Sequence, residues 1–217
     1  MSSRDRLLKV ALELFSHKGF EAVSVRDIAE AAGVNLAAIS YHFGGKAGLY
    51  RAALHEPLGR PRDDIERFDR PHFSLHQSLQ GLYTAILQPF TLHDQAQQCI
   101  RLHLREMMDG SPAWSEQIQH DFLPVHRALA RVLRRHLGLK RDDDDLMRLV
   151  FTLTGLANHL FLSQDVVRAM RPGLLASPAA VHRWRDGLVA SAEALIHLEA
   201  QRRAAVTSPA HPQKCPP

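Results

Sequence analysis

Small hydrogen-bonding side chains gather in one short stretch of the chain, between residues 24 and 46. Ser24 stands where a short helix should begin, so its hydroxyl and the free N–H groups of the first turn would bind a phosphate. Asn35 and Ser40 belong to one short helix, and their side chains can hydrogen-bond to the edges of bases. A phosphate-binding group next to side chains that can bind base edges is typical of a nucleic-acid-binding site. For Ser24 the alternative is a helix cap without a ligand.

The rest of the sequence offers little catalytic or metal-binding chemistry. No HxxxH or HxH spacing occurs among the histidines between residues 93 and 159, so we expect no metal and no cofactor. The acidic run 142–145 lacks the calcium-loop pattern and is expected to charge a helix N-terminus. GxSxG, Walker A, dinucleotide-glycine and HExxH motifs are all absent from the sequence. A small helical enzyme is therefore the less favoured alternative, and we expect no enzyme activity.

Four helices must position the polar groups near the N-terminus. Their apolar spacing and caps predict residues 3–18, 25–32, 36–43 and 46–54. Two short helices joined by a turn at Gly33, and supported by a longer first helix, are the parts of a helix-turn-helix. Ala29 is small where two helix axes must approach each other. Asp27 lies three residues after Ser24, as in a capping box.

The third helix is expected to be the recognition helix in the major groove of DNA. Such a helix presents its first and outward residues to base edges. These residues are Asn35, Leu36, Ala37, Ala38, Ser40 and Tyr41. Because the alanines can make only apolar or close-approach contacts, Asn35 and Ser40 would supply most of the direct readout. The first 50 residues contain six Lys or Arg against five Asp or Glu, so this expectation depends on pattern and not on charge.

The segments 25–35 (VRDIAEAAGVN) and 39–46 (ISYHFGGK) resemble the N-terminal signature of TetR-family transcriptional regulators. The second segment, with the following Gly-Leu-Tyr at 48–50 and the Leu-Arg-Glu-Met at 104–107, is similar to the CecR-like subgroup. The resemblance covers about residues 5–54. It implies that Tyr41, His42 and Lys46 contact the phosphate backbone. The alternatives are a Tyr41 partly buried against the fourth helix, an inert surface His42 and a solvated Lys46.

The remaining sequence predicts a larger helical domain, and the whole chain is expected to be all-α. Helices are expected near residues 73–88, 94–109, 113–137, 142–166 and 178–203, with Pro124 splitting or kinking the third. We divide the chain into a helix-turn-helix domain (1–50), an effector-binding and dimerisation domain (51–205) and a Pro-rich disordered tail (206–217).

Two wide apolar stripes mark the last two long helices, and the resemblance implies that they form the interface of a homodimer. The residues predicted for this interface are Leu149, Leu153, Leu160, Trp184, Leu188 and Leu195. Core packing within one subunit is the alternative. A cavity for a small-molecule effector is expected among the helices between residues 73 and 165. Its predicted lining is Tyr83, Ile100, His103, Leu104, Met107, Trp114, Phe122, His159 and Phe161, for which ordinary core packing is again the alternative.

These expectations combine into one functional hypothesis. The chain would be a repressor that binds double-stranded, palindromic operator DNA and is released by a small-molecule effector; the alternatives are an activator or an effector-independent DNA-binding protein. No apolar run approaches the roughly 20 residues that span a bilayer, and the N-terminus lacks a secretory segment. Two distant cysteines, Cys99 and Cys215, suggest a reducing compartment. We therefore expect a cytoplasmic protein without membrane contact.

Overall fold

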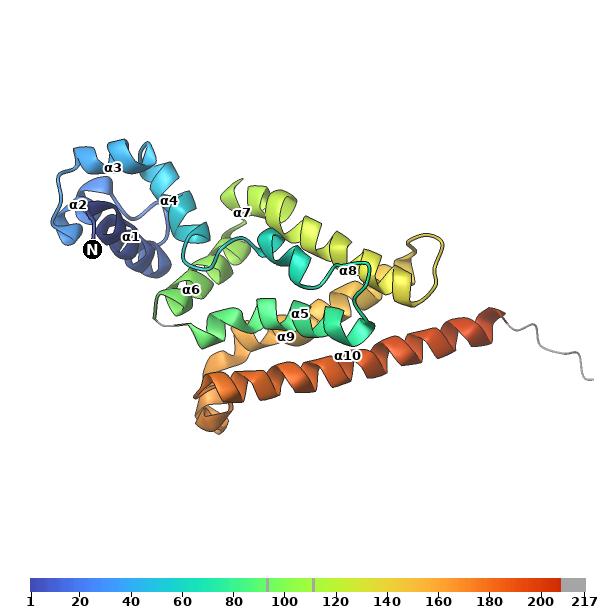
Figure 1. Cartoon of the computed structure of the whole chain (residues 1–217). Coiled ribbons are helices and arrows are strands. Elements are labelled where there is room, and N and C mark those ends of the chain that lie inside the picture. Colours follow the sequence, from blue (N-terminus) through green and yellow to red (C-terminus); the bar gives the residue numbers. More distant parts are fainter. Residues whose placement is uncertain (93, 111, 208–217) are drawn as a thin grey trace, which may run out of the picture.

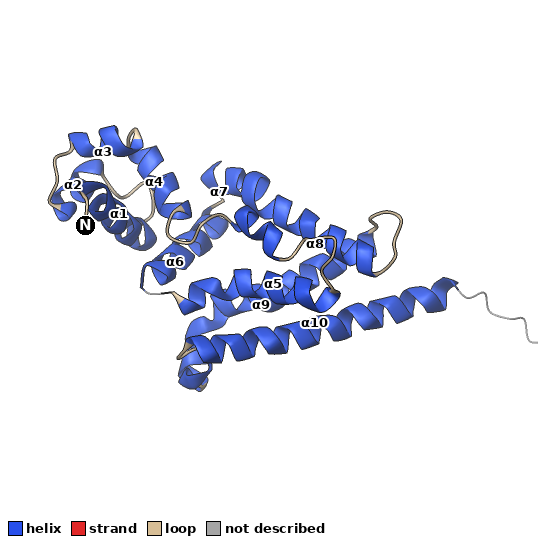
Figure 2. Ribbon diagram, in the orientation of Figure 1, coloured by secondary structure: helices blue, strands red, loops and turns tan. Residues whose placement is uncertain are grey.

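The computed structural model describes residues 1–92, 94–110 and 112–207, and every regular element in these ranges is helical (Figure 1, Figure 2). The N-terminal head contains α1 (Ser3–Lys18), α2 (Val25–Ala32), α3 (Ala37–Phe43) and α4 (Lys46–His55). The larger bundle contains η1 (Pro61–Arg67), α5 (Leu75–Leu87), η2 (Gln88–Thr91), α6 (Asp94–Asp109), α7 (Pro112–Gln117), η3 (Ile118–Phe122), α8 (Leu123–His136), α9 (Asp144–Met170), η4 (Pro172–Leu174) and α10 (Pro178–Thr207). The all-α expectation is confirmed. Most of the predicted tail, residues 208–217, lies outside the described residues, while α10 continues to Thr207.

Local sequence signals begin and end the head helices as expected. Ser24 and Asp27 form a reciprocal capping box at the start of α2. Gly33 ends α2 in the left-handed region, with φ 62°, where glycine is free of the Cβ penalty. The helices close over a core in which Phe15, Ile28 and Ile39 are fully buried. This core supports α3 from beneath.

Gly48 brings α4 against the end of α3. A Cβ at this position would lie 1.7 Å from the carbonyl oxygen of Phe43, which is main chain and cannot rotate away. Only glycine therefore permits this approach of the two helices. The orientation of α3 depends on it.

The larger bundle has its own apolar core, built by α5, α8, α9 and α10. Leu82, Leu133 and Leu153 are almost completely buried there. In the long segment predicted for 113–137, the helix breaks as expected: a single π-helical turn, η3, separates α7 from α8. Pro124 at the start of α8 explains the break, because its ring clashes with the carbonyl group four residues earlier. The short helix η1 was not predicted.

Helix α6 joins the two parts (Figure 1). Cys99 and Leu102 of α6 are buried in the same core as the head residues Phe15 and Leu54. The predicted boundary after residue 50 falls inside α4, whose residues Ala53 and Leu54 also belong to the head core. The head core thus includes part of the larger bundle.

Four of the six residues predicted for the dimer interface are buried within the single chain, where the alternative of core packing applies to them. Leu149, Leu153, Leu160 and Leu188 are buried in the bundle core, and Trp184 and Leu195 are partly buried against it. The apolar periodicity marks a buried face but not the partner that buries it. Different apolar side chains of these helices are exposed. They are Phe151, Leu162, Val166, Met170 and Leu198.

Helix α9 is long and apolar enough to cross a membrane by length and composition alone. Polar residues such as Thr154 and Asn158 interrupt it, so it meets this limit by its mean hydropathy and not as a continuous apolar run. Its residues Leu146, Val150 and Leu153 fill the bundle core, as in the central helix of a globular domain. Its N-terminus is also fixed by charged groups at the surface.

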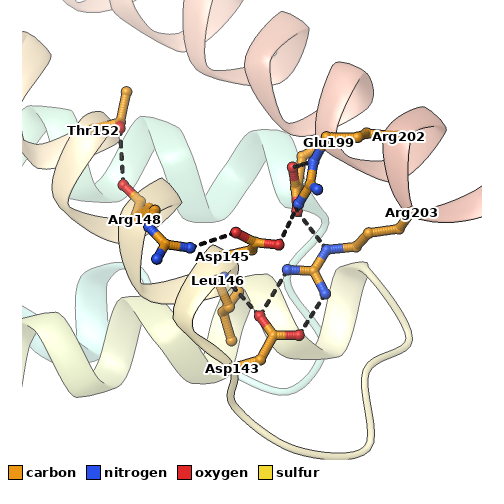
Figure 3. Close-up of polar contacts among 8 residues, drawn as sticks. All are labelled: Asp143, Asp145, Leu146, Arg148, Thr152, Glu199, Arg202 and Arg203. Atoms are coloured by element: carbon orange, nitrogen blue, oxygen red, sulfur yellow. Dashed lines mark hydrogen bonds and ion pairs between the residues drawn. The ribbon is translucent and has the colours of Figure 1, made fainter. Parts of the chain in front are cut away.

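An ion-pair network ties the start of α9 to the last turns of α10 (Figure 3). Asp143 caps α9 by accepting from the N–H of Leu146 at 2.8 Å, and its two carboxylate oxygens accept from Arg203 at 2.7 and 2.8 Å. Asp145 binds Arg202, and Glu199 accepts from both arginines. The Arg203 hydrogen bonds hold the pKa of Asp143 well below its usual range. The acidic run therefore charges a helix N-terminus, as the sequence predicted.

We expect Gly48→Ala to disturb the pairing of α3 and α4, because the added methyl group overlaps the Phe43 carbonyl. Urea unfolding should show a loss of about 1–3 kcal/mol, the range for overpacked sites. Ala47→Ser, at the exposed neighbouring position of α4, is the control and should leave stability nearly unchanged. A Gly48→Ala protein as stable as the parent would contradict this account.

Asp143→Ala should lower the free energy of unfolding by about 1–2 kcal/mol at neutral pH, because it removes a helix cap and the partner of Arg203. Since the pKa of Asp143 is depressed in the folded state, this contribution is present above pH 3.8, its usual pKa, and is lost as the pH falls further. Urea titrations of parent and variant across this range measure the difference. Asp165→Ala, at a side chain 96% exposed, is the control; an equal loss there would argue against a specific role.

Candidate nucleic-acid interface

Helix α3 presents a continuous outer surface made from most of the predicted base-contacting residues. Asn35, Leu36, Ala37, Ser40 and Tyr41 are exposed, and Tyr41 is 85% exposed. The alternative that Tyr41 packs against α4 is therefore wrong. Ala38 is half-buried and packs on the head core. The surface can enter a groove without local unfolding.

Asn35 is held in place by a hydrogen bond within the head. Its Oδ1 accepts from the N–H of Ala37 at 2.8 Å, so Asn35 caps the helix, which begins at Ala37, one residue later than predicted. With its oxygen engaged, the side chain offers its amide N–H groups outward. Asn35 therefore acts as a hydrogen-bond donor on this surface.

Ser24 serves as a cap and keeps a free donor. Its Oγ accepts from the N–H of Asp27 at 3.1 Å, and its own N–H donates to the Asp27 carboxylate at 3.0 Å. These hydrogen bonds lower the pKa of Asp27, which stays ionised. The hydroxyl proton of Ser24 is left to donate to an outside acceptor. The cap and the phosphate contact are thus compatible.

Lys46 and His42 both have neighbours inside the head. The Lys46 ammonium group lies 4.3 Å from the centre of the Phe20 ring, a cation–π contact that orients the side chain at the start of α4. His42 is half-buried, with its Nε2 3.2 Å from Ser3 Oγ. Lys46 is half-buried at the start of α4, while His42 is turned towards α1.

Buried polar contacts connect this surface to the larger bundle. The Tyr50 hydroxyl of α4 donates to the buried carboxylate of Glu106 on α6. Burial and this hydrogen bond raise the pKa of Tyr50, so the hydroxyl keeps its proton. Burial also raises the pKa of the Cys99 thiol to about 12, which makes it a poor nucleophile. Sequence reasoning missed Tyr50 and Glu106 as a pair because they lie on separate helices.

The residues predicted for an effector cavity are dispersed. Tyr83 is buried, with its hydroxyl donating to the carbonyl of Leu153, and Ile100 is buried too. Met107 and His159 are exposed. The aromatic members pair with neighbours: Trp114 with Phe122 at 5.3 Å between ring centres, and Phe161 with Phe90 at 4.8 Å. His103 and Leu104 are half-buried on α6.

A cavity of about 240 Å³ lies elsewhere, at the junction of α4, η1, α7 and η3, and its lining is mostly polar. It includes none of the nine predicted residues. Within the described residues, no group of three or more His, Cys, Asp or Glu side chains is arranged to hold a metal ion.

Comparison with known proteins identifies both parts of the chain. Residues 7–53 match the family model described as bacterial regulatory proteins, tetR family. Residues 75–196 match the model for the C-terminal domain of the HTH-type transcriptional dual regulator CecR. The second match alone covers more than half of the chain.

Individual relatives agree with these matches. The HTH-type transcriptional repressor BdcR of Escherichia coli is 40% identical over 70 residues, which are 31% of this chain and 36% of BdcR. The chain thus spans little more than a third of BdcR. The negative transcriptional regulator IcaR of the biofilm operon icaADBC in Staphylococcus epidermidis is 22% identical over 70% of this chain and 80% of its own length.

The fold is also found in solved structures. The ketosteroid transcriptional regulator KstR2 of Mycobacterium tuberculosis superposes with a TM-score of 0.58 at 22% identity, over 88% of this chain and 93% of that chain. Salmonella enterica GusR gives a TM-score of 0.55 at 18% identity, over 87% and 94%. The helical head, the exposed outer surface of α3 and the two family models agree: the chain belongs to the TetR family of helix-turn-helix transcriptional regulators, with a C-terminal domain of the CecR type.

Proposed function

We propose that the protein is a cytoplasmic homodimeric repressor that binds a palindromic operator and is released from it by a small-molecule effector. The exposed surface of α3, fixed from behind by the head core, is the observation that carries this proposal. The direction of regulation is supported by the relatives BdcR and IcaR, which are named as a repressor and a negative regulator. An activator, or a DNA-binding protein without an effector, is the alternative.

Dimerisation would place two recognition helices in successive major grooves, about 34–36 Å apart. The exposed apolar side chains of α9 and α10, among them Phe151, Leu162 and Val166, support a contact with a second copy. They lie on helices whose opposite faces are already buried.

Analytical ultracentrifugation of the full chain should give a dimer, and a monomer at working concentrations would contradict the proposal.

In DNA contact, α3 would read base edges while the groups around it hold phosphates. Asn35, as a donor, fits acceptors such as guanine O6 and N7 or thymine O4. Tyr41 and Lys46 would bind backbone phosphates from the two sides of the α3–α4 turn, and Ser24 would do so from the start of α2. Because few polar groups face the bases, much of the affinity would come from the phosphate contacts.

Fluorescence anisotropy with DNA from upstream of the protein's own gene tests this function directly. The full chain should bind that fragment, and random DNA of equal length should compete much more weakly. Equal competition by random DNA would contradict operator recognition.

Lys46→Ala should weaken binding to every DNA sequence and reduce the slope of log affinity against log salt concentration by about 1, because one phosphate contact is lost. Tyr41→Ala should weaken binding in the same general way, and it should leave stability unchanged since the side chain is exposed. Lys140→Ala, an equal loss of charge in the larger bundle, is the control. An unchanged affinity and salt slope for Lys46→Ala would remove its phosphate role.

Changes at Asn35 should alter operator preference. Asn35→Asp keeps the oxygen that caps α3 but replaces the outward donor by an acceptor. We expect a loss of about 1–3 kcal/mol at the contacted base pair, and a smaller loss on operators that carry cytosine there. Binding measured on a set of operators with single base changes would show this. A uniform loss across the whole set would mean that Asn35 does not contact a base.

A further inference from the structure

The cavity between the head and the larger bundle has a buried floor of polar atoms without hydrogen-bond partners. Asp121 of η3 and Gln117 of α7 line it, and each is only 2% exposed. Among the described residues, Asp121 Oδ1, Gln117 Oε1 and His55 Nδ1 have no hydrogen-bond partner. The Asp121 carboxylate lies 3.8 Å from His55 Nδ1 and 3.9 Å from Arg62 Nε, both beyond hydrogen-bond range. Native structures rarely leave buried acceptors unpaired, so the floor is suited to a donor from outside the chain.

The orientation of the Gln117 amide follows from its other contact. His103 Nδ1 lies 2.8 Å from the carbonyl oxygen of Cys99, which can only accept, so Nδ1 carries the proton. Burial lowers the pKa of His103 and favours the neutral ring. His103 Nε2 is then an acceptor, and it takes a hydrogen bond from Gln117 Nε2 at 2.8 Å. Gln117 Oε1 is thus left as an acceptor towards the cavity.

The rim of the cavity carries more positive than negative charge. Arg51 of α4, Arg60 just before η1 and Arg62 of η1 line it together with Glu116 of α7, and all four are exposed. Guanidinium groups bind carboxylates through paired hydrogen bonds. A ligand that satisfies both rim and floor needs an anionic group together with a hydrogen-bond donor a short distance away. An apolar effector meets neither requirement.

We propose that this cavity binds a small carboxylate bearing a neighbouring hydroxyl or amine. The arginines hold the carboxylate, and the hydroxyl or amine donates to Asp121 Oδ1 and Gln117 Oε1. Bound there, the ligand bridges α4 to η3 and changes the position of α4, which orients α3 through Gly48. Such a carboxylate would be the effector of the regulator proposed above, and its effect on DNA binding depends on that function.

Calorimetric titration of the full chain with three four-carbon dicarboxylates tests the binding. L-malate carries a hydroxyl, L-aspartate carries an amine and succinate carries neither. Malate or aspartate should bind at least about tenfold more tightly than succinate, as expected for one hydrogen bond to a buried charged acceptor. The tighter of the two identifies the donor. No saturable binding by either, or equal binding by all three, overturns the proposal.

Variants locate the binding within the cavity. Arg62→Gln should weaken binding about tenfold or more, and Asp121→Asn should reduce the preference over succinate. Arg67→Gln, the same change on η1 at a residue paired with Asp64 outside the cavity, should bind as the parent does. Equal effects of Arg62→Gln and Arg67→Gln overturn the assignment. Circular dichroism checks that each variant is folded.

Anisotropy with operator DNA separates this inference from the proposed function. The tighter dicarboxylate should lower operator affinity in the parent but not in Arg62→Gln. If the unliganded protein fails to bind its operator, the proposed function fails while the binding site can still stand. If the operator is bound and calorimetry is silent, the cavity assignment fails alone. Ligand binding that leaves operator affinity unchanged overturns the effector role.

Discussion

The close packing of α4 on two sides is the constraint on which the rest of the structure depends. On one side Gly48 lets α4 approach the carbonyl of Phe43, which sets the angle of α3. On the other, Tyr50 donates a hydrogen bond to the buried carboxylate of Glu106. A buried carboxylate without such a donor is strongly destabilising, so separating α4 from α6 would cost free energy. The orientation of the outer surface of α3 is therefore coupled to the larger bundle.

Helix α6 gives this coupling a physical route. Cys99 and Leu102 pack in the head core, and His103, the residue after Leu102, hydrogen-bonds to Gln117 at the edge of the cavity. The head and the cavity thus share one helix through short, directional contacts. A ligand can use this route only if it binds the two arrangements of α4 with different affinity. The polar floor of the cavity provides groups whose hydrogen bonding would differ between them.

Features set by neighbouring residues were predictable from sequence, while features set by distant ones were not. The Ser24–Asp27 capping box, the turn at Gly33 and the break at Pro124 each depend on a few adjacent residues, and each is confirmed. The apolar stripes through Leu153 on α9 and Leu188 on α10 predicted buried faces, yet they could not show that the chain's own core buries them. Asp121 and Arg62 meet only through the fold, and isolated buried polar groups have no periodic signal. For that reason the predicted cavity was apolar and the one described is polar.

The π-helical turn η3 suggests how relatives of this protein could diverge. A residue added to an α-helix rotates everything before it by about 100° around the axis. The π-helical turn contains one residue more than an α-helical turn. This residue thus decides which side of α7 meets the head, and it brings Gln117 and Asp121 to the same cavity. Insertion or deletion of a single codon here would turn different side chains of α7 towards the cavity, while the rest of the fold stays the same. New chemical selectivity could arise in this lineage without any substitution in the pocket wall.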